Sequence, residues 1–136
     1  MEKQQTELSP IRFKLRYVPQ IRNKDAELIF EFFMVFSRFE FALKYTGFRK
    51  VINGRVEPDW KKFGISIQDA FDIDKSPEIR RAFDYLLANQ PKVQIFNGEK
   101  LEWQERSRNK NDDIVVQVID CVKGVRNNLF HGGKFP

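Results

Sequence analysis

The chain has 136 residues, 41% hydrophobic and 32% charged, with 24 Lys and Arg against 19 Asp and Glu. This length and composition indicate one globular domain and exclude a disordered chain. The single cysteine excludes an intrachain disulfide framework. No segment resembles a signal peptide, and none is apolar enough to span a membrane. We therefore expect a cytoplasmic protein. The net charge of +5 permits an anionic partner such as RNA.

The first part of the chain combines a polar segment, an extended segment and a long apolar helix. Residues 1–10 are expected to be disordered. Ile11–Tyr17 alternates apolar and basic residues, as in a strand. A helix is expected from Asp25 to about Thr46, ending at Gly47, with apolar residues on almost every side. Such a helix is either central in a bundle or buried against a second subunit.

The few polar residues of this helix are candidates for a site. Glu31, Arg38 and Glu40 interrupt its apolar surface, so we expect them to face the terminal helix or a shared cleft. An intrahelical ion pair is the alternative for each of them.

The middle of the chain is predicted from turn and capping residues. We expect, in chain order, a loop at Val51–Pro58 with a turn at Asn53-Gly54, a short helix at Asp59–Phe71, a helix that opens at Ser76-Pro77 and stops before Pro91, and a small hairpin of Lys92–Phe96 and Leu101–Gln104.

The last helix is predicted over Asn111–His131, from apolar residues that recur every three or four positions. Asn111 or Asp112 is expected to cap its start, and Gly132-Gly133 to end it. Gly124 lacks a side chain, which allows another backbone to approach closely.

Arg126 and His131, the only histidine, are the candidate catalytic pair of this helix. Arg126 projects into the apolar arc, where a charged group needs a carboxylate, a set of carbonyls or a bound anion. A guanidinium beside an imidazole can hold a phosphate and move a proton next to it. Two other interpretations stay open: Arg126 forms a core ion pair with Glu31, Glu40 or an aspartate, and His131 is a frayed terminal residue.

The run Arg126-Asn127-Asn128-Leu129-Phe130-His131 resembles the signature of the HEPN superfamily, an arginine and a following polar residue ahead of a histidine in the last long helix. The early aromatic helix around Phe36–Lys44 is similar to the first core helix of many members, and the resemblance spans roughly residues 25–134. Some HEPN toxins carry a tyrosine two positions after the histidine; here that position is Gly133.

The resemblance implies an all-α fold, a HEPN-like bundle of four to five helices with a small β-hairpin or an extended N-terminal segment. It also implies a homodimer that brings two Arg/His pairs into one cleft and cleaves RNA without a metal or cofactor, in a toxin or phage-defence protein with a possible antitoxin partner. Arg126 and His131 would be catalytic. Asn127 and Asn128, with Arg38 and Glu40, would bind substrate.

Two rival functions belong to other classes. One is a non-catalytic HEPN module that binds RNA, a nucleotide or a protein partner. The other is a structural helical domain in which Arg126 is part of a core ion pair.

Overall fold

The computed structural model describes residues 23–107 and 109–131, without the side chains of Asn23 and His131. The expected strand at Ile11–Tyr17, the expected disorder of residues 1–10 and the expected helix end at Gly132-Gly133 lie outside these residues. The described elements are, in chain order, α2 (Asn23–Tyr45), β1 (Arg49–Ile52), β2 (Arg55–Pro58), α3 (Trp60–Ile67), α4 (Pro77–Ala88), β3 (Val93–Phe96), β4 (Leu101–Gln104) and α5 (Ile114–His131).

The prediction of an all-α bundle is wrong. The described part of the chain is mixed α and β, with 56% of it in four helices and 15% in two antiparallel hairpins. None of these four helices combines the length and the apolar composition of a membrane span.

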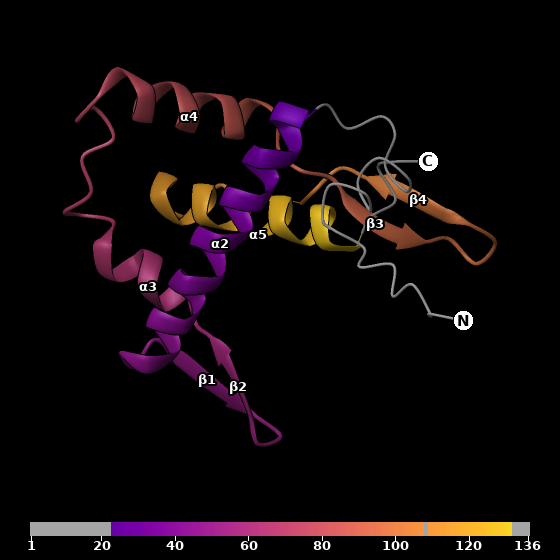
Figure 1. Cartoon of the computed structure of the whole chain (residues 1–136), viewed down its shortest axis with the longest axis horizontal. Coiled ribbons are helices and arrows are strands. Elements are labelled where there is room, and N and C mark those ends of the chain that lie inside the picture. The colour runs from indigo at the N-terminus through magenta and orange to yellow at the C-terminus, as the bar shows by residue number, and fades with distance from the viewer. Residues whose placement is uncertain (1–22, 108, 132–136) are drawn as a thin grey trace, which may run out of the picture.

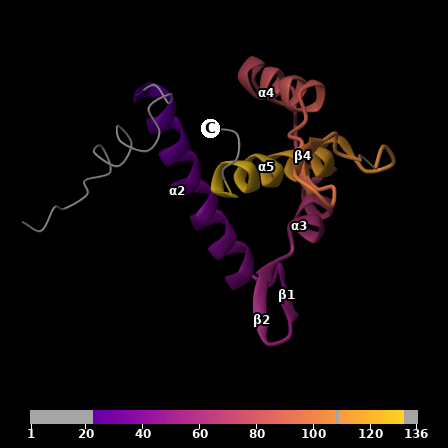
Figure 2. The same cartoon turned by 90° about the vertical axis from the view of Figure 1, so that its right-hand side faces the viewer.

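Helix α5 lies at the centre of the molecule (Figure 1). Helices α3 and α4 pack against it, while α2 stands on its other side and leans away from it toward one end (Figure 2). The two hairpins project from different sides of this helical assembly, and β1–β2 joins the end of α2 to the start of α3.

Polar side chains cap three of the helices. Ser76 accepts a hydrogen bond from the Ile79 amide and opens α4, as its position before Pro77 predicts. Asp59 accepts one from the Lys62 amide and opens α3, which ends at Ile67 rather than Phe71. At the start of α5 the Asp113 carboxylate accepts from the Val115 amide, so neither Asn111 nor Asp112 is the capping residue.

The β1–β2 hairpin occupies the segment expected to be a loop. Asn53 and Gly54 both have positive φ, as the turn signal suggests. The strands on either side of this turn are exposed along almost their full length. Because neither face is buried, the sequence has no apolar and polar alternation to reveal the strands. The second hairpin, at β3 and β4, is confirmed.

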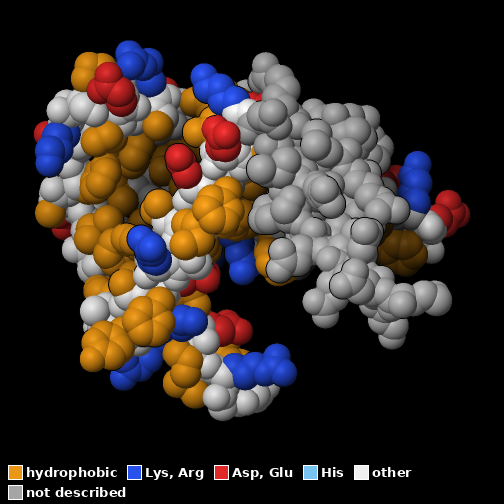
Figure 3. Space-filling view, in the orientation of Figure 1, with side chains coloured by type: hydrophobic (Ala, Val, Ile, Leu, Met, Phe, Trp, Pro, Cys, Tyr) orange, Lys and Arg blue, Asp and Glu red, His pale blue; other side chains and the backbone are white. Residues whose placement is uncertain are grey.

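The core consists of two apolar clusters that share residues of α5. Phe36, Leu43 and Trp60 form one cluster, and Phe83, Val115 and Val118 form the other. Ile119 and Val122 pack against both. Between the clusters a groove of about 480 Å³ is open to the surface and is lined only by apolar side chains. It is the orange hollow between α2 and the helices α3 and α4 in Figure 3.

Close approach at Gly124 fixes the loop before α5 to the middle of that helix. An ideal Cβ at Gly124 would lie 2.5 Å from Arg106 Nη2 and 2.7 Å from Pro91 Cγ. The expected close neighbour is therefore present, although it consists of side chains rather than backbone. The Arg106 guanidinium donates to Asp120 Oδ2 at 2.7 Å and to the Pro91 carbonyl at 3.4 Å.

We predict that Gly124→Ala lowers the free energy of unfolding by about 1–3 kcal/mol, measured by urea denaturation. The added methyl group displaces a hydrogen-bonded guanidinium and meets a rigid proline ring. In an Arg106→Ala background the same change is expected to cost clearly less. An increase in stability, which helix propensity alone predicts for Gly to Ala, would contradict this packing.

Candidate functional site

Arg126 is half-buried on α5 between two aromatic rings. Its Cζ lies 5.0 Å from the ring centroid of Phe130 and 5.8 Å from that of Phe36. Its Nη1 donates to Asn127 Oδ1 at 3.0 Å. No carboxylate among the described residues forms an ion pair with it, so the expected alternative of a core ion pair with Glu31 or Glu40 is not what these residues show. The rings orient the guanidinium, while most of its five N–H donors are left for other partners.

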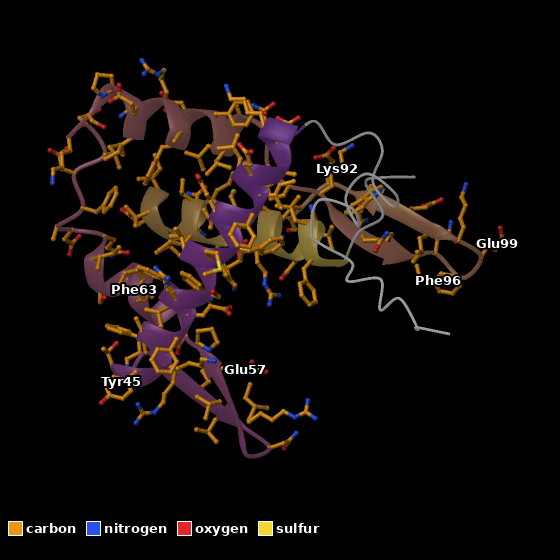
Figure 4. All side chains as sticks on the ribbon, in the orientation of Figure 1. Tyr45, Glu57, Phe63, Lys92, Phe96 and Glu99 are labelled. Atoms are coloured by element: carbon orange, nitrogen blue, oxygen red, sulfur yellow. The ribbon has the colours of Figure 1, made fainter. Side chains whose placement is uncertain are left out.

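Arg126 opens into a polar pocket of about 410 Å³ between α2, the β1–β2 hairpin and α5. Charged and amide side chains from all three elements line it: Glu40, Lys50, Glu57, Lys123, Arg126 and Asn127. Phe36 and Trp60 form its apolar wall. Glu57 projects from β2 at the foot of the molecule (Figure 4). The pocket therefore places two ammonium groups and two carboxylates around one guanidinium.

Two residues of α2 that the sequence assigned to the same cleft are separated by the helix. Glu40 is half-buried and lines the Arg126 pocket, whereas Arg38 is exposed and does not. Residues two apart on an α-helix point about 200° away from each other, so only one of the two can face α5. The assignment of Arg38 to substrate binding stays a prediction without a geometric basis in this pocket.

The two asparagines after Arg126 also face different surroundings. Asn127 is exposed, lines the pocket and accepts from Arg126. Asn128 is buried, and its amide donates to the carbonyl of Lys92 at 2.9 Å, next to the start of β3 (Figure 4). Asn128 thus links the end of α5 to the start of the second hairpin through this hydrogen bond.

His131 is the last residue of α5. Its backbone lies five residues beyond Arg126, about 7.5 Å further along the helix axis. Its side chain lies outside the described residues, so its proposed acid–base role stays a prediction.

Three charged residues of the pocket carry no signal in the sequence. Glu57 belongs to the segment that was expected to be a loop, Lys50 lies directly before that segment, and Lys123 is a half-buried lysine of α5. The sequence contains no motif that marks them. Their signal is purely spatial, because the pocket joins segments about 70 residues apart.

Within the described ranges, no group of three or more His, Cys, Asp and Glu side chains is placed to hold a metal ion. The comparisons with known proteins found no matching family model, no matching curated protein and no matching solved structure.

We predict that Asn128→Ala lowers the free energy of unfolding by about 1–3 kcal/mol, because it removes the hydrogen bond that this buried amide donates to the Lys92 carbonyl and leaves that carbonyl without it. Asn127→Ala is the matched control. Its side chain is exposed, so its effect is expected to stay within about 0.5 kcal/mol. Equal losses in thermal or urea unfolding would contradict the structural role of Asn128.

Proposed function

We propose that this protein is a metal-independent endoribonuclease of the HEPN type, of the toxin or phage-defence class. The observation that carries the proposal is an arginine held by two aromatic rings in a polar pocket, with no carboxylate partner among the described residues. On the same helix the only histidine of the chain follows five residues later. The proposal takes its family from this motif and not from an all-α fold.

The pocket suits a phosphodiester. Among the described residues the Arg126 guanidinium donates to Asn127 alone, and its planar arrangement of N–H donors matches two phosphate oxygens. As the ribose 2′-oxygen attacks the adjacent phosphorus, negative charge grows on the non-bridging oxygens, and a fixed guanidinium stabilises that charge. The phosphorus gains a bond to the 2′-oxygen and loses its bond to the 5′-oxygen of the next nucleotide. The products are a 2′,3′-cyclic phosphate and a 5′-hydroxyl.

Two proton transfers accompany these bond changes, one from the attacking 2′-hydroxyl and one to the leaving 5′-oxygen. His131 carries out one of them as general base or general acid, and water takes up or supplies the other proton. Asn127, which already accepts from Arg126, helps to keep the guanidinium oriented toward the phosphate. DNA lacks the 2′-hydroxyl and would not be cleaved.

A homodimer is part of this proposal, and the surface of α2 supports it. One face of α2 lines the apolar groove with Phe32, Val35 and Phe39. The opposite face presents a second stripe of exposed side chains, at positions four or seven residues apart: Phe30, Met34, Phe41 and Tyr45. The seven exposed large apolar side chains of α2 offer on the order of 800 Å², counted over both of these faces. One side of a standard-size interface buries a comparable area, so a dimer of that size would have to cover part of both faces.

The catalytic prediction is tested with wild type, Arg126→Ala and His131→Ala incubated with total RNA in EDTA. Wild type is expected to produce fragments with 2′,3′-cyclic phosphate ends. We expect a loss of about 10²–10⁴-fold for His131→Ala and about 10²–10³-fold for Arg126→Ala. Arg81→Ala, which removes an exposed arginine of α4, is the control and keeps full activity.

Absence of cleavage by folded, dimeric wild type would contradict the ribonuclease and favour the non-catalytic binding module. A loss of several kcal/mol of stability in Arg126→Ala would instead favour the structural domain, since it would reveal an unpaired buried counter-charge.

The dimer prediction uses Phe41→Glu, which places a charge in the middle of the exposed stripe of α2. We expect it to convert a dimer into a monomer in sedimentation velocity runs, because a carboxylate is costly to bury in an apolar interface. Tyr85→Glu changes an equally exposed aromatic residue on α4 and is expected to leave the dimer intact. A wild type that is monomeric at micromolar concentration would overturn this part of the proposal.

A further inference from the structure

The Arg126 pocket continues along α5 into a second polar pocket. This second pocket has a volume of about 330 Å³ and is lined by residues of α5, of the start of α3 and of the loop before α5. Lys50, Trp60 and Lys123 line both pockets. The combined groove follows one side of α5 and its approach, from Asp112 to Asn127, over roughly 22 Å of helix length.

Arg106 is the cation of this groove that the fold itself uses. Its Nη1 lies 2.7 Å from Asp120 Oδ2 and its guanidinium is largely shielded from solvent. A charge-assisted bond of this length is short and strong. Arg106 therefore anchors the loop before α5 and is not available to a ligand.

Three lysines of the groove have only loose partners. Lys50 Nζ lies 3.8 Å from Asp59, and Lys61 Nζ lies 3.8 Å from Asp112. Lys123 Nζ lies 3.9 Å from Asp120, whose carboxylate is already held by Arg106. These distances exceed hydrogen-bond length. Lys50 and Lys61 are exposed to solvent, and Lys123 is half-buried. Exposed ion pairs of this kind contribute about 0–1 kcal/mol, so a phosphate can replace them at little cost.

The four carboxylates of the groove are divided equally between its two pockets. Asp112 and Asp120 lie beside lysines in the second pocket, as described above. Glu40 and Glu57 lie at the Arg126 end. A carboxylate repels phosphate but accepts hydrogen bonds from hydroxyl groups, which the ribose of RNA provides. The groove thus presents loosely held ammonium groups along its length and hydroxyl acceptors near the arginine.

We propose that this groove binds the sugar–phosphate backbone of single-stranded RNA, through Lys50, Lys61 and Lys123, on one side of the phosphate held by Arg126. The inference rests on the proposed function, because Arg126 marks the scissile phosphate. In this arrangement the β1–β2 hairpin forms a wall of the groove and holds the RNA strand against α5. The contacts are to phosphate, so they position RNA without reading its sequence.

The experiment measures binding separately from cleavage. His131→Ala protein is titrated into a fluorescein-labelled single-stranded RNA of mixed sequence, and anisotropy gives Kd at several salt concentrations between 50 and 200 mM, a range over which phosphate contacts lose much of their affinity. Lys50→Ala, Lys61→Ala and Lys123→Ala are added singly and together. Each single lysine substitution is expected to reduce the slope of log Kd against log salt concentration by about 0.7, and the triple substitution is expected to reduce it by about 2.

Lys100→Ala is the matched control. Lys100 is also exposed and also has a loose carboxylate partner, at 3.7 Å, but it lies beside the tip of the other hairpin, near the labelled Glu99 (Figure 4). It is expected to leave Kd and slope unchanged. Thermal melting of each variant verifies folding, since removal of exposed lysines costs little stability.

The outcomes separate the two proposals. If the triple variant has the same Kd and slope as its parent, or if the parent binds no RNA, the proposal that the groove binds RNA is wrong. If wild type cleaves RNA while the lysine variants bind it normally, the ribonuclease proposal is supported and the groove proposal is wrong. If wild type never cleaves but the lysine variants lose affinity and Lys100→Ala does not, the groove stands and the ribonuclease fails.

Discussion

The structure depends on how closely neighbouring elements approach α5 at two glycines. At Gly64 of α3, an ideal Cβ would lie 3.0 Å from Ile119 Cδ1 and 3.2 Å from Val116 Cγ2. At Gly124 the neighbours are the Arg106 guanidinium and the Pro91 ring. The absence of side chains at these points lets α3 and the loop before α5 pack against different parts of the same helix. Val116, Ile119 and Arg106, which make these approaches, also line the second polar pocket.

The second constraint is an excess of apolar surface. Helix α2 contributes Phe36 and Leu43 to the core, yet a wholly apolar groove stays open beside it and an exposed aromatic stripe covers its far side. Residues 23–107 and 109–131 leave both surfaces open, and apolar surfaces of this kind favour association. Because α2 carries the stripe and lines one side of the groove, a second copy of the chain would offer a ridge and a hollow at once.

The charged residues of the groove differ in the distance to their carboxylate partners. Arg106 forms a short, shielded bond and holds the fold together. The ammonium groups of Lys50, Lys61 and Lys123 lie 3.8–3.9 Å from their carboxylates; Lys50 and Lys61 are exposed and Lys123 is half-buried. Arg126 is different again, because aromatic rings hold it where an ion pair would otherwise be expected. A polyanion would compete with the loose pairs and leave the short one undisturbed.

Sequence alone determined the features that depend on neighbours along the chain. Apolar periodicity located α2, α4 and α5, Ser76-Pro77 marked a helix start, and the second hairpin was expected at Lys92–Phe96 and Leu101–Gln104. The first hairpin was missed because its strands are exposed on both faces, which removes the alternation by which strands are recognised. The all-α prediction failed for that reason and because the other hairpin was treated as a minor addition.

Tertiary structure decided which residues meet. The sequence placed Arg126 on the apolar arc of α5. Only the position of α2 decides that Glu40, and not Arg38, lines the pocket with Arg126. Only the packing of α5 decides that Asn128 is buried against Lys92 while Asn127 lines the pocket. In the sequence, Gly64 only lowers the helix propensity of a short helix. In the folded protein, its lack of a side chain permits close contact with Ile119. Lys50 and Lys123 are 73 positions apart, and no local pattern links them. Helix and turn formation depend on nearby residues, while a pocket depends on distances that only the packing of the whole chain sets.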